Sequence, residues 1–389
     1  MKSNYKALYE LVERIDERNS DGSVTDLLGV SIDKCFIKSV ANTNGTDLTK
    51  YKVIRKDDFA VSLMQVSRDS KIPVARLDEY DKAIMSPAYP IFRVKDKKVI
   101  LPEYLDMWFK RPEFDREAAF IAVGGVRGSM PWEEFEKMQL PVPPIEEQLE
   151  IVASYKAITD RIALKRRIND NLEATAQAVF QEQFASFYGA DELPDGYRII
   201  NLDNLCTVKG GKRLPADCKL LDTPTDHPYI RVRDVGSNRY VCLTNQFQYI
   251  DEETYSAISR YIVNTGDIVI SIVGTIGLLG KIHSSLDKAN LTENCVKLAN
   301  IHTVTSDYLY YTLCYKKQIK EIDLLTVGAV QAKLPMYNIQ SMKILVPPTK
   351  AIEAFQRKMN VLNEQIEANT VEIQKLYELE EVLLAKLSD

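Results

Sequence analysis

The feature that most constrains this sequence is an internal duplication with an offset of 204 residues. Residues 124–144 align without a gap with residues 328–348, and both windows end in Val-Pro-Pro. The same offset places Tyr104 and Leu105 on a second Tyr-Leu pair at residues 308–309. A duplication of this length predicts two similar modules. Two such modules can bind a partner with approximate two-fold symmetry, and duplex DNA is the commonest partner of this kind.

The composition is that of a folded protein with more than one domain. At 389 residues the chain can form two or three domains, each with its own core. The sequence contains no apolar run of about 20 residues and no signal-peptide core at its N-terminus. Its six cysteines are scattered, without a Cys-x-x-Cys pair, so we expect free thiols. These features predict a cytoplasmic protein without membrane contact.

The net charge of −5 argues against a protein that coats nucleic acid without selectivity, because phosphate binding usually requires a basic balance. A local basic face remains compatible with this net charge. Residues 206–240 contain seven lysines or arginines and four aspartates, which leaves a local charge of +3. This stretch is therefore a candidate for contact with an anionic partner.

Each module is expected to consist mainly of short strands, followed by a short helix, a glycine-containing loop and a last strand that ends at the proline pair. Residues 25–100 contain short apolar runs of β-favouring residues between polar turns. Residues 57–62 and 266–271 are corresponding runs, here at an offset of 209. The short helices are predicted at residues 102–109 and 306–315, and the turn at residues 193–198 marks the start of the second module.

A long helix is expected after each proline pair, because proline is tolerated at a helix start and disfavours helix before it. Lys165 and Asn169 interrupt the apolar stripe of the first helix, and Asn369 of the second is a predicted buried polar residue that fixes the register. The predicted helix-pair seam, at alternating spacings of four and three, consists of Ile151, Tyr155, Ile158, Ile162, Leu172, Phe355, Met359, Leu362, Ile366, Asn369, Ile373 and Leu376.

Each helix of about 35 residues would span roughly 50 Å, too long to be buried within one module. We therefore expect the two helices to pair in antiparallel fashion as a coiled coil. The alternatives are that each helix folds back on its own module, or that the seam drives homodimerisation. The predicted fold class is α+β: a first module (1–144), a central helix (145–186), a second module (187–348) and a C-terminal helix (349–389).

Motifs for catalysis are weak throughout the sequence. Residues 274–281 approach the phosphate-loop pattern, but Thr275 stands where glycine is needed and Ile282 where a hydroxyl residue is needed. A tight β-hairpin is the better interpretation. The three histidines are not at metal-ligand spacing from one another or from a cysteine. We therefore predict no catalytic residue and no metal site.

Several loops carry the residue types that contact DNA. Glycine permits close backbone approach, arginine and lysine bind phosphates or guanine edges, and glutamine can bind adenine. The alternative is that these loops are ordinary solvated turns. The candidate DNA-binding residues are Gln65, Ser67, Arg68, Lys71, Arg127, Ser129, Lys209, Lys212, Arg213, Arg231, Arg233, Gln331 and Lys333.

With these motifs the chain resembles the specificity subunits of type I restriction–modification systems, over nearly its whole length. The motifs that carry the resemblance are Leu-Pro-Val-Pro-Pro-Ile-Glu-Glu-Gln at residues 140–148 and Leu-Pro-Asp-Gly-Tyr-Arg at residues 193–198. The strand-and-loop stretches that end at Ser67-Arg68 and at residues 271–274 add to it. One departure is that the second long helix begins Thr-Lys-Ala-Ile at residues 349–352, without the Glu-Gln of the first copy.

The resemblance implies two target-recognition domains, each of which reads half of a split double-stranded DNA site. It also implies that the helices bind two methyltransferase (modification) subunits, which use S-adenosylmethionine to methylate adenine, and that ATP- and Mg-dependent restriction subunits can join. On this view the chain itself is not an enzyme and binds no cofactor. Half-site centres about one DNA turn apart, roughly 10 base pairs, are expected.

Two other classes of function remain open from the sequence. One is a coiled-coil adaptor with two protein-binding modules and no DNA role. The other is an enzyme with an unrecognised site. Salt-dependent binding to duplex DNA separates the first from a DNA-recognition subunit, and nuclease or methyl-transfer activity of the isolated chain would support the second.

Overall fold

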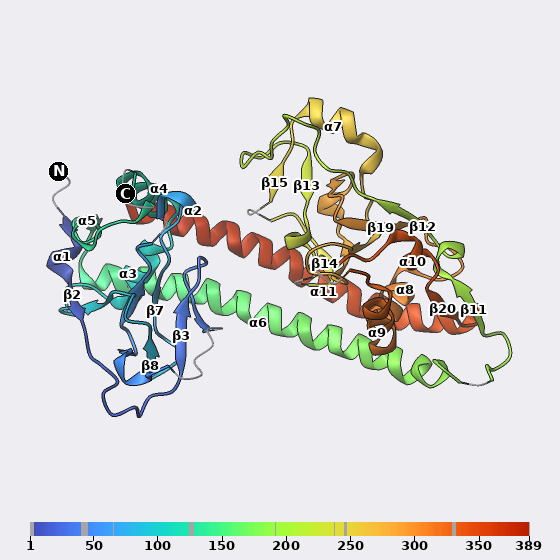
Figure 1. Ribbon diagram of the computed structural model, residues 1–389, viewed down its shortest axis with the longest axis horizontal. Helices are drawn as coiled ribbons and strands as arrows, with labels where there is room; N and C mark the ends of the chain where they lie inside the picture. The colour runs from blue at the N-terminus through green and yellow to red at the C-terminus, as the bar shows by residue number, and fades with distance from the viewer. Residues whose placement is uncertain are drawn as a thin grey trace. The chain divides into compact units, whose positions relative to one another are not determined.

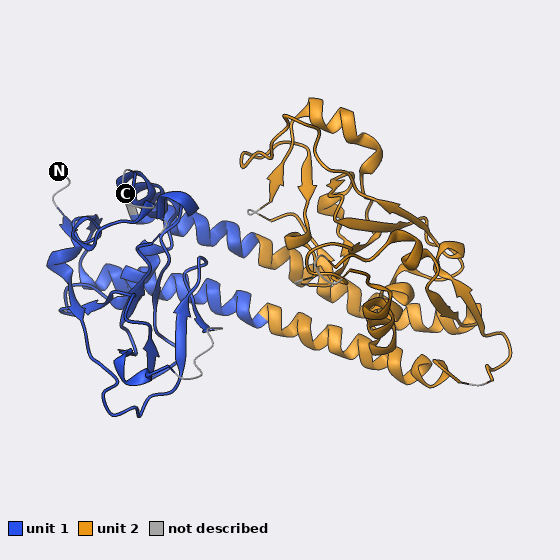
Figure 2. Ribbon diagram, viewed as in Figure 1, with its two compact units in different colours: residues 1–164, 375–389 blue, residues 165–374 orange. Residues whose placement is uncertain are grey.

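The computed structural model describes residues 4–39, 46–64, 66–123, 128–190, 192–236, 238–244, 247–328 and 332–388. The chain divides into two compact units (Figure 2). Unit 1 consists of residues 1–164 and 375–389, and unit 2 consists of residues 165–374. Both boundaries fall inside the long helices α6 (Ile145–Phe184) and α11 (Thr349–Ala385), so each unit contains part of both helices.

Unit 1 contains two four-stranded sheets and a two-stranded one. The first has the order β2-β9-β6-β7 and is antiparallel; the second has the order β4-β3-β8-β5, with β3 and β8 parallel; β1 pairs with β10. The strands are β1 (Tyr5–Ala7), β2 (Val12–Ile15), β3 (Leu27–Val30), β4 (Phe36–Lys38), β5 (Lys52–Arg55), β6 (Phe59–Val61), β7 (Val74–Arg76), β8 (Lys82–Met85), β9 (Ile91–Val94) and β10 (Gln139–Pro141). The short helices are α1 (Leu8–Leu11), α2 (Val66–Asp69), α3 (Pro102–Phe109), α4 (Pro112–Ile121) and α5 (Trp132–Phe135).

Unit 2 repeats this plan with a five-stranded sheet, β12-β19-β16-β17-β14, and a three-stranded sheet, β15-β13-β18, while β11 pairs with β20. As with β3 and β8, the neighbours β13 and β18 are parallel. The strands are β11 (Arg198–Asn201), β12 (Thr207–Gly210), β13 (Pro228–Ile230), β14 (Tyr240–Val241), β15 (Gln248–Tyr249), β16 (Ile268–Ser271), β17 (Leu279–Ile282), β18 (Asn290–Leu291), β19 (Cys295–Ala299) and β20 (Lys343–Val346). The short helices are α7 (Glu252–Ile258), α8 (Ser306–Leu313), α9 (Lys316–Leu325) and α10 (Met336–Gln340).

The sequence duplication is a structural duplication. Helices α3 and α4 become α8 and α9 when 204 is added to their first and last residues. The hydroxyl of Tyr104 donates to the carbonyl of Pro141 at 3.3 Å, and that of Tyr308 donates to the carbonyl of Leu345 at 2.7 Å. Donor and acceptor are each shifted by 204 residues, so the last strand is held on the short helix in the same way in both units.

An ion pair with a buried carboxylate also occurs twice, each time between neighbouring strands. Asp58 precedes β6 and lies 2.9 Å from Arg93 of β9, and Asp267 precedes β16 and lies 3.7 Å from Lys297 of β19. Both carboxylates are buried, and each also accepts a hydrogen bond from the backbone N–H three residues earlier. The predicted correspondence of residues 57–62 with residues 266–271 is therefore confirmed at the level of individual contacts.

The long helices contact each other in antiparallel fashion within each unit, as the seam predicted (Figure 1). In unit 1 the Tyr155 hydroxyl donates to Glu380 Oε1 at 2.8 Å. In unit 2 Lys165 Nζ donates to Asn369 Oδ1 at 2.9 Å, and Asn369 Nδ2 donates to Asn169 Oδ1 at 2.8 Å. All twelve predicted seam residues are buried or half-buried, and Asn369 is fully buried.

Each helix pair also enters the core of its own unit. In unit 2, Phe180 and Phe184 of α6 and Phe355 of α11 pack around Tyr308 of α8 with ring centroids 5.1–6.1 Å apart. In unit 1, Tyr155 and the end of α11 join the cluster that contains the phenylalanines of β6, β9 and α3. Pairing between helices and packing onto a module therefore occur together, although the sequence suggested them as alternatives.

Candidate nucleic-acid interface

In unit 1 the loop after β6 and the loop after α4 lie against each other. The backbone N–H of Met130 donates to the carbonyl of Leu63 at 2.9 Å. A Cβ atom at Gly128, whose φ is +73°, would collide with the hydroxyl of Ser67, so this close approach requires glycine. The candidates Ser67, Arg68 and Ser129 are thereby brought together, although they are about 60 residues apart in the sequence.

Unit 2 joins the corresponding loops by the same backbone contact. The N–H of Leu334 donates to the carbonyl of Ile272 at 3.0 Å, at offsets of 204 and 209 from the unit 1 pair. Lys333 is exposed and forms antiparallel bridges with both Val273 and Val327. A hairpin was predicted at residues 274–281; in the structure residues 272–278 connect β16 to β17, and residues 279–281 belong to β17. Within this hairpin Ser271 Oγ accepts from the N–H of Leu278 at 2.8 Å. The phosphate-loop interpretation is therefore excluded.

The basic loop after β12 lies at the same end of the five-stranded sheet. The backbone N–H of Lys212 donates to the carbonyl of Leu291 at 2.8 Å, and the N–H of Ile272 donates to the carbonyl of Asn294 at 2.8 Å. Residues 291–294 thus lie between the Lys212 loop and the β16–β17 hairpin. Arg213 is exposed and pairs with Glu293 at 2.7 Å. Residues 291–294 were not among the predicted contact residues, because their only sequence signal is a polar turn before a strand.

Some of the candidate side chains are engaged in the local fold. Arg231 is 15% exposed in its side chain; its guanidinium contacts Asp234 at 3.2 Å and Gln248. This arrangement favours a structural role for Arg231. Arg239, which contributed to the basic balance of residues 206–240, is buried, so the basic surface is smaller than the sequence indicated.

The other candidates lie on the surface. Arg68 of α2 is 63% exposed and pairs with Asp69, and Arg233 is 62% exposed with Asp234 at 3.7 Å. Lys71 follows α2, and Lys209 lies on β12; both are exposed. Three further candidates, Gln65, Arg127 and Gln331, lie outside the described residues.

The described part of the chain offers little for catalysis. Among the residues that the structure describes, no group of three or more His, Cys, Asp and Glu side chains could hold a metal ion. No helix within the described ranges is long and apolar enough to cross a membrane. All six cysteines are free thiols, and burial raises the pKa of Cys206 and of Cys295 to about 12.

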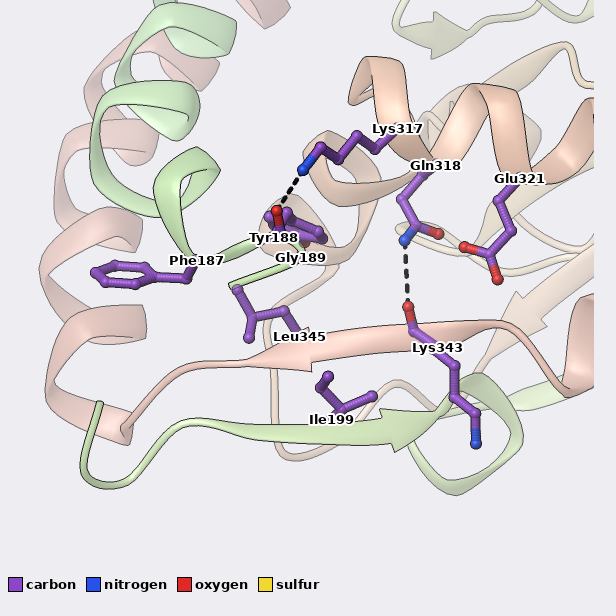
Figure 3. Close-up of a pocket in the computed structure, with 9 residues that line it drawn as sticks. All are labelled: Phe187, Tyr188, Gly189, Ile199, Lys317, Gln318, Glu321, Lys343 and Leu345. Atoms are coloured by element: carbon purple, nitrogen blue, oxygen red, sulfur yellow. Dashed lines mark hydrogen bonds between the residues drawn. The ribbon is translucent and has the colours of Figure 1, made fainter. Parts of the chain in front are cut away.

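A pocket of about 230 Å³ lies in unit 2 between α9, β20 and the segment after α6 (Figure 3). Its polar groups are used to hold these segments together. Lys317 donates to the carbonyl of Tyr188, and Gln318 donates to the carbonyl of Lys343 at 3.2 Å. Its nine lining residues include no histidine or cysteine, and we assign it no chemical role.

The fold and the paired loops define a class of protein with two related α+β modules, each built on a shared pair of long helices. Residues 194–382 match the family model of the type I restriction modification DNA specificity domain. The chain is 22% identical to the MjaIX specificity subunit of Methanocaldococcus jannaschii, over 75% of this chain and 69% of that one. It is 20% identical to the HindI specificity subunit of Haemophilus influenzae, over 93% and 92% of the two chains.

The fold agrees with that of a solved relative. The type I restriction-modification S subunit from M. genitalium superposes with a TM-score of 0.52 at 13% identity, over 99% of this chain and 96% of that one. The family model and the curated relatives all describe specificity subunits of type I restriction–modification systems, and this chain is similar to them. The family model covers the second copy of the duplication, and the first copy is related to it by the shared contacts described above.

Proposed function

We propose that the chain recognises a bipartite DNA target and directs a type I complex to it for adenine methylation and, where restriction subunits join, for cleavage. The observation that carries this proposal is the pair of loops that each unit holds together by the same backbone hydrogen bond. The loops of unit 1 carry the exposed Arg68 and the half-buried Ser67 and Ser129, and those of unit 2 carry the exposed Lys333. Cationic and hydroxyl groups are the groups that contact phosphates and base edges. Residues 1–144 and 187–348 would be the two target-recognition domains.

In this proposal each unit reads one half of the target through its own loops. The contact residues are Ser67, Arg68, Lys71 and Ser129 in the first domain and Lys212, Arg213, Arg233 and Lys333 in the second. The bulk charge of −5 supports selective contact at these loops rather than general binding to nucleic acid. No observation favours the adaptor or the enzyme alternative.

The chemistry would reside on partner subunits. Two modification subunits would bind the long helices and hold S-adenosylmethionine, and restriction subunits would hold ATP and Mg. The chain's own part would be to bind and orient the DNA, which agrees with a family of specificity subunits. The helices are suited to partner binding because α6 and α11 each run without interruption through parts of both units.

The proposal is tested by co-expressing the chain with its cognate modification subunit and mapping the methylated adenines. We expect a split sequence with a fixed spacer. Arg68→Ala should relax the base preference or lower the occupancy of one half only, and Lys333→Ala should affect the other half only. If both variants affect the same half, or neither half, the assignment of one half to each unit is wrong.

A second experiment tests the role of the helices. Insertion of one heptad into α6 and one into α11, in register, keeps the seam and lengthens both helices by about 10 Å. We expect the same two half-site sequences to be methylated with a longer spacer. An unchanged spacer would refute the idea that the helix pair sets it.

A further inference from the structure

Unit 2 contains a buried polar network centred on Asp307 of α8. Arg239, just before β14, has a side chain only 2% exposed, and its guanidinium pairs with Asp307 of α8. It also donates to the Tyr311 hydroxyl at 2.9 Å. Lys281 of β17 approaches the same carboxylate at 2.7 Å, and the Asp307 side chain is 4% exposed. Two cations from the sheet thus converge on one buried carboxylate of the module's short helix.

The same carboxylate connects the module to the long helices. Gln356 and Asn363 of α11 donate to Asp307 Oδ2 at 2.6 Å and 2.7 Å. On the other side, the Tyr311 hydroxyl donates to Glu173 of α6 at 3.0 Å. Asp307 therefore contacts donors from the sheet and from α11. Tyr311, one helical turn after Asp307, donates to α6.

The contacts continue along one face of α11. Gln374 donates to the carbonyl of Leu243, which follows β14, and Glu367 lies 3.7 Å from His283, which follows β17. The positions 356, 363, 367 and 374 recur at spacings of seven, four and seven, so they share one side of the helix. Polar and directional contacts thus run along this side for about five turns.

The positions of unit 1 that are equivalent to Asp307, Tyr311 and Gln356 do not form such a network among the described residues. The residue equivalent to Asp307 is Glu103, whose side chain is 42% exposed and lies 3.7 Å from Arg76. The equivalents of Tyr311 and Gln356 are Met107 and Val152, which pack in the hydrophobic cluster of unit 1. Apolar packing tolerates small rotations, whereas buried ion pairs with several fixed donors do not, because each misaligned group would be left unpaired.

From these contacts we infer that the Arg239–Asp307 network fixes the orientation of the second recognition domain on its helix pair. Arg239, Lys281 and Asp307 are then positioning residues for the proposed DNA recognition, on which this inference rests. They touch no base themselves. Burial of a charge cluster is not expected to add much net stability, since replacing buried ion pairs by apolar groups is often neutral. The network should instead affect the orientation of the second domain, and therefore the range of spacer lengths between the half-sites that the complex accepts.

The test uses the full chain co-expressed with its modification subunit and a plasmid library in which the spacer varies. Asp307→Asn keeps the shape of the side chain and removes its charge. We expect the half-site sequences to stay unchanged. Methylation of sites whose spacer is one base pair too long or too short should rise at least about tenfold relative to methylation at the preferred spacer. The reason is that misplacing a bound group by about 1 Å changes rates up to about 100-fold. Glu103→Gln, the equivalent change in unit 1, should leave the spacer profile unchanged.

A second variant separates positioning from stability. Arg239→Met, Lys281→Met and Asp307→Leu together remove three charges and keep apolar volume, so the chain should still fold, with a lower thermal stability because Gln356 and Asn363 lose their acceptor. Its spacer tolerance should widen as in Asp307→Asn. A folded triple variant with the spacer profile of the wild type would overturn the inference. If the wild-type complex itself methylates no bipartite target, the proposed function fails instead.

Discussion

The start of helix α6 depends on one buried side chain, Gln148. Its Oε1 accepts a hydrogen bond from the N–H of Leu101 at 2.9 Å. Its Nε2 donates to the carbonyls of Val99 and Pro143, at 2.9 Å and 2.8 Å. The Gln148 side chain is completely buried. One side chain thus satisfies three backbone groups and ties the long helix to the segment before α3.

We predict that Gln148→Met destabilises unit 1 by about 3–5 kcal/mol. Methionine keeps the length and the volume of the side chain but leaves three part-buried backbone groups without these partners, and an unpaired group of this kind costs about 1–3 kcal/mol when it is fully buried. The lower part of the summed range applies because partial relaxation is expected. For a unit of this size, each kcal/mol lowers the melting temperature by about 2–4 °C, so a decrease of roughly 6–20 °C should follow.

Calorimetry of the full chain measures this effect. Gln181→Met, on the exposed face of the same helix, is the matched control and should change the melting temperature only slightly. If Gln148→Met shifts the transition no more than this control, the three hydrogen bonds do not stabilise the helix start. The second copy offers a converse experiment, because its equivalent residue, Ile352, is buried in an apolar cluster. Ile352→Gln should also destabilise, since its amide would lack partners.

Three further predictions concern charge, pH and thiols. Lys212→Ala should lower DNA affinity and reduce the slope of log K against log salt by about 0.9 if it contacts a phosphate, whereas Arg231→Ala should leave this slope unchanged. Burial alone would raise the pKa of Asp307, but the two neighbouring cations outweigh it and hold the pKa at about 2. This pKa lies below the value of an aspartate in the unfolded chain, so the ionised Asp307 contributes about 2 kcal/mol of stability above pH 4, and this contribution is lost as the pH falls towards 2. In acid titrations followed by circular dichroism, Asp307→Asn should remove this dependence of stability on pH. A thiol reagent at neutral pH should label the exposed Cys35, and the buried Cys295 only after denaturation, by mass spectrometry of peptides.

The sequence predicted the elements that depend on local patterns. The seam of α6 and α11, the first short helix of each pair (α3 and α8) and the hairpin between β16 and β17 follow from apolar periodicity, prolines and glycines, which act over a few residues. The second short helices, α4 and α9, were not predicted. The offset of 204 also predicted which elements are equivalent. It holds from α3 to the start of α6, because in this stretch the loops of the two copies have equal lengths.

The buried polar contacts could not be predicted from one sequence. Arg239 and Asp307 are 68 residues apart, and nothing local distinguishes Arg239 from the exposed Arg233. The pairing of a buried charge depends on which strands become neighbours, and that is a property of the tertiary fold. The ion pair of Asp267 with Lys297 is a partial exception, because Lys297 is related by the offset of 204 to the cationic Arg93.

The way the loops are joined has a consequence for the target itself. The contact that holds each loop pair is between backbone groups, Met130 with Leu63 and Leu334 with Ile272, so it does not depend on which side chains the loops carry. The side chains at the loops do differ, since the hydroxyl of Ser129 in one unit corresponds to the ammonium group of Lys333 in the other. Different donors select different bases. We therefore predict that the two half-sites differ in sequence, and a palindromic pair of half-sites in a methylation map would show that these loops do not determine the bases.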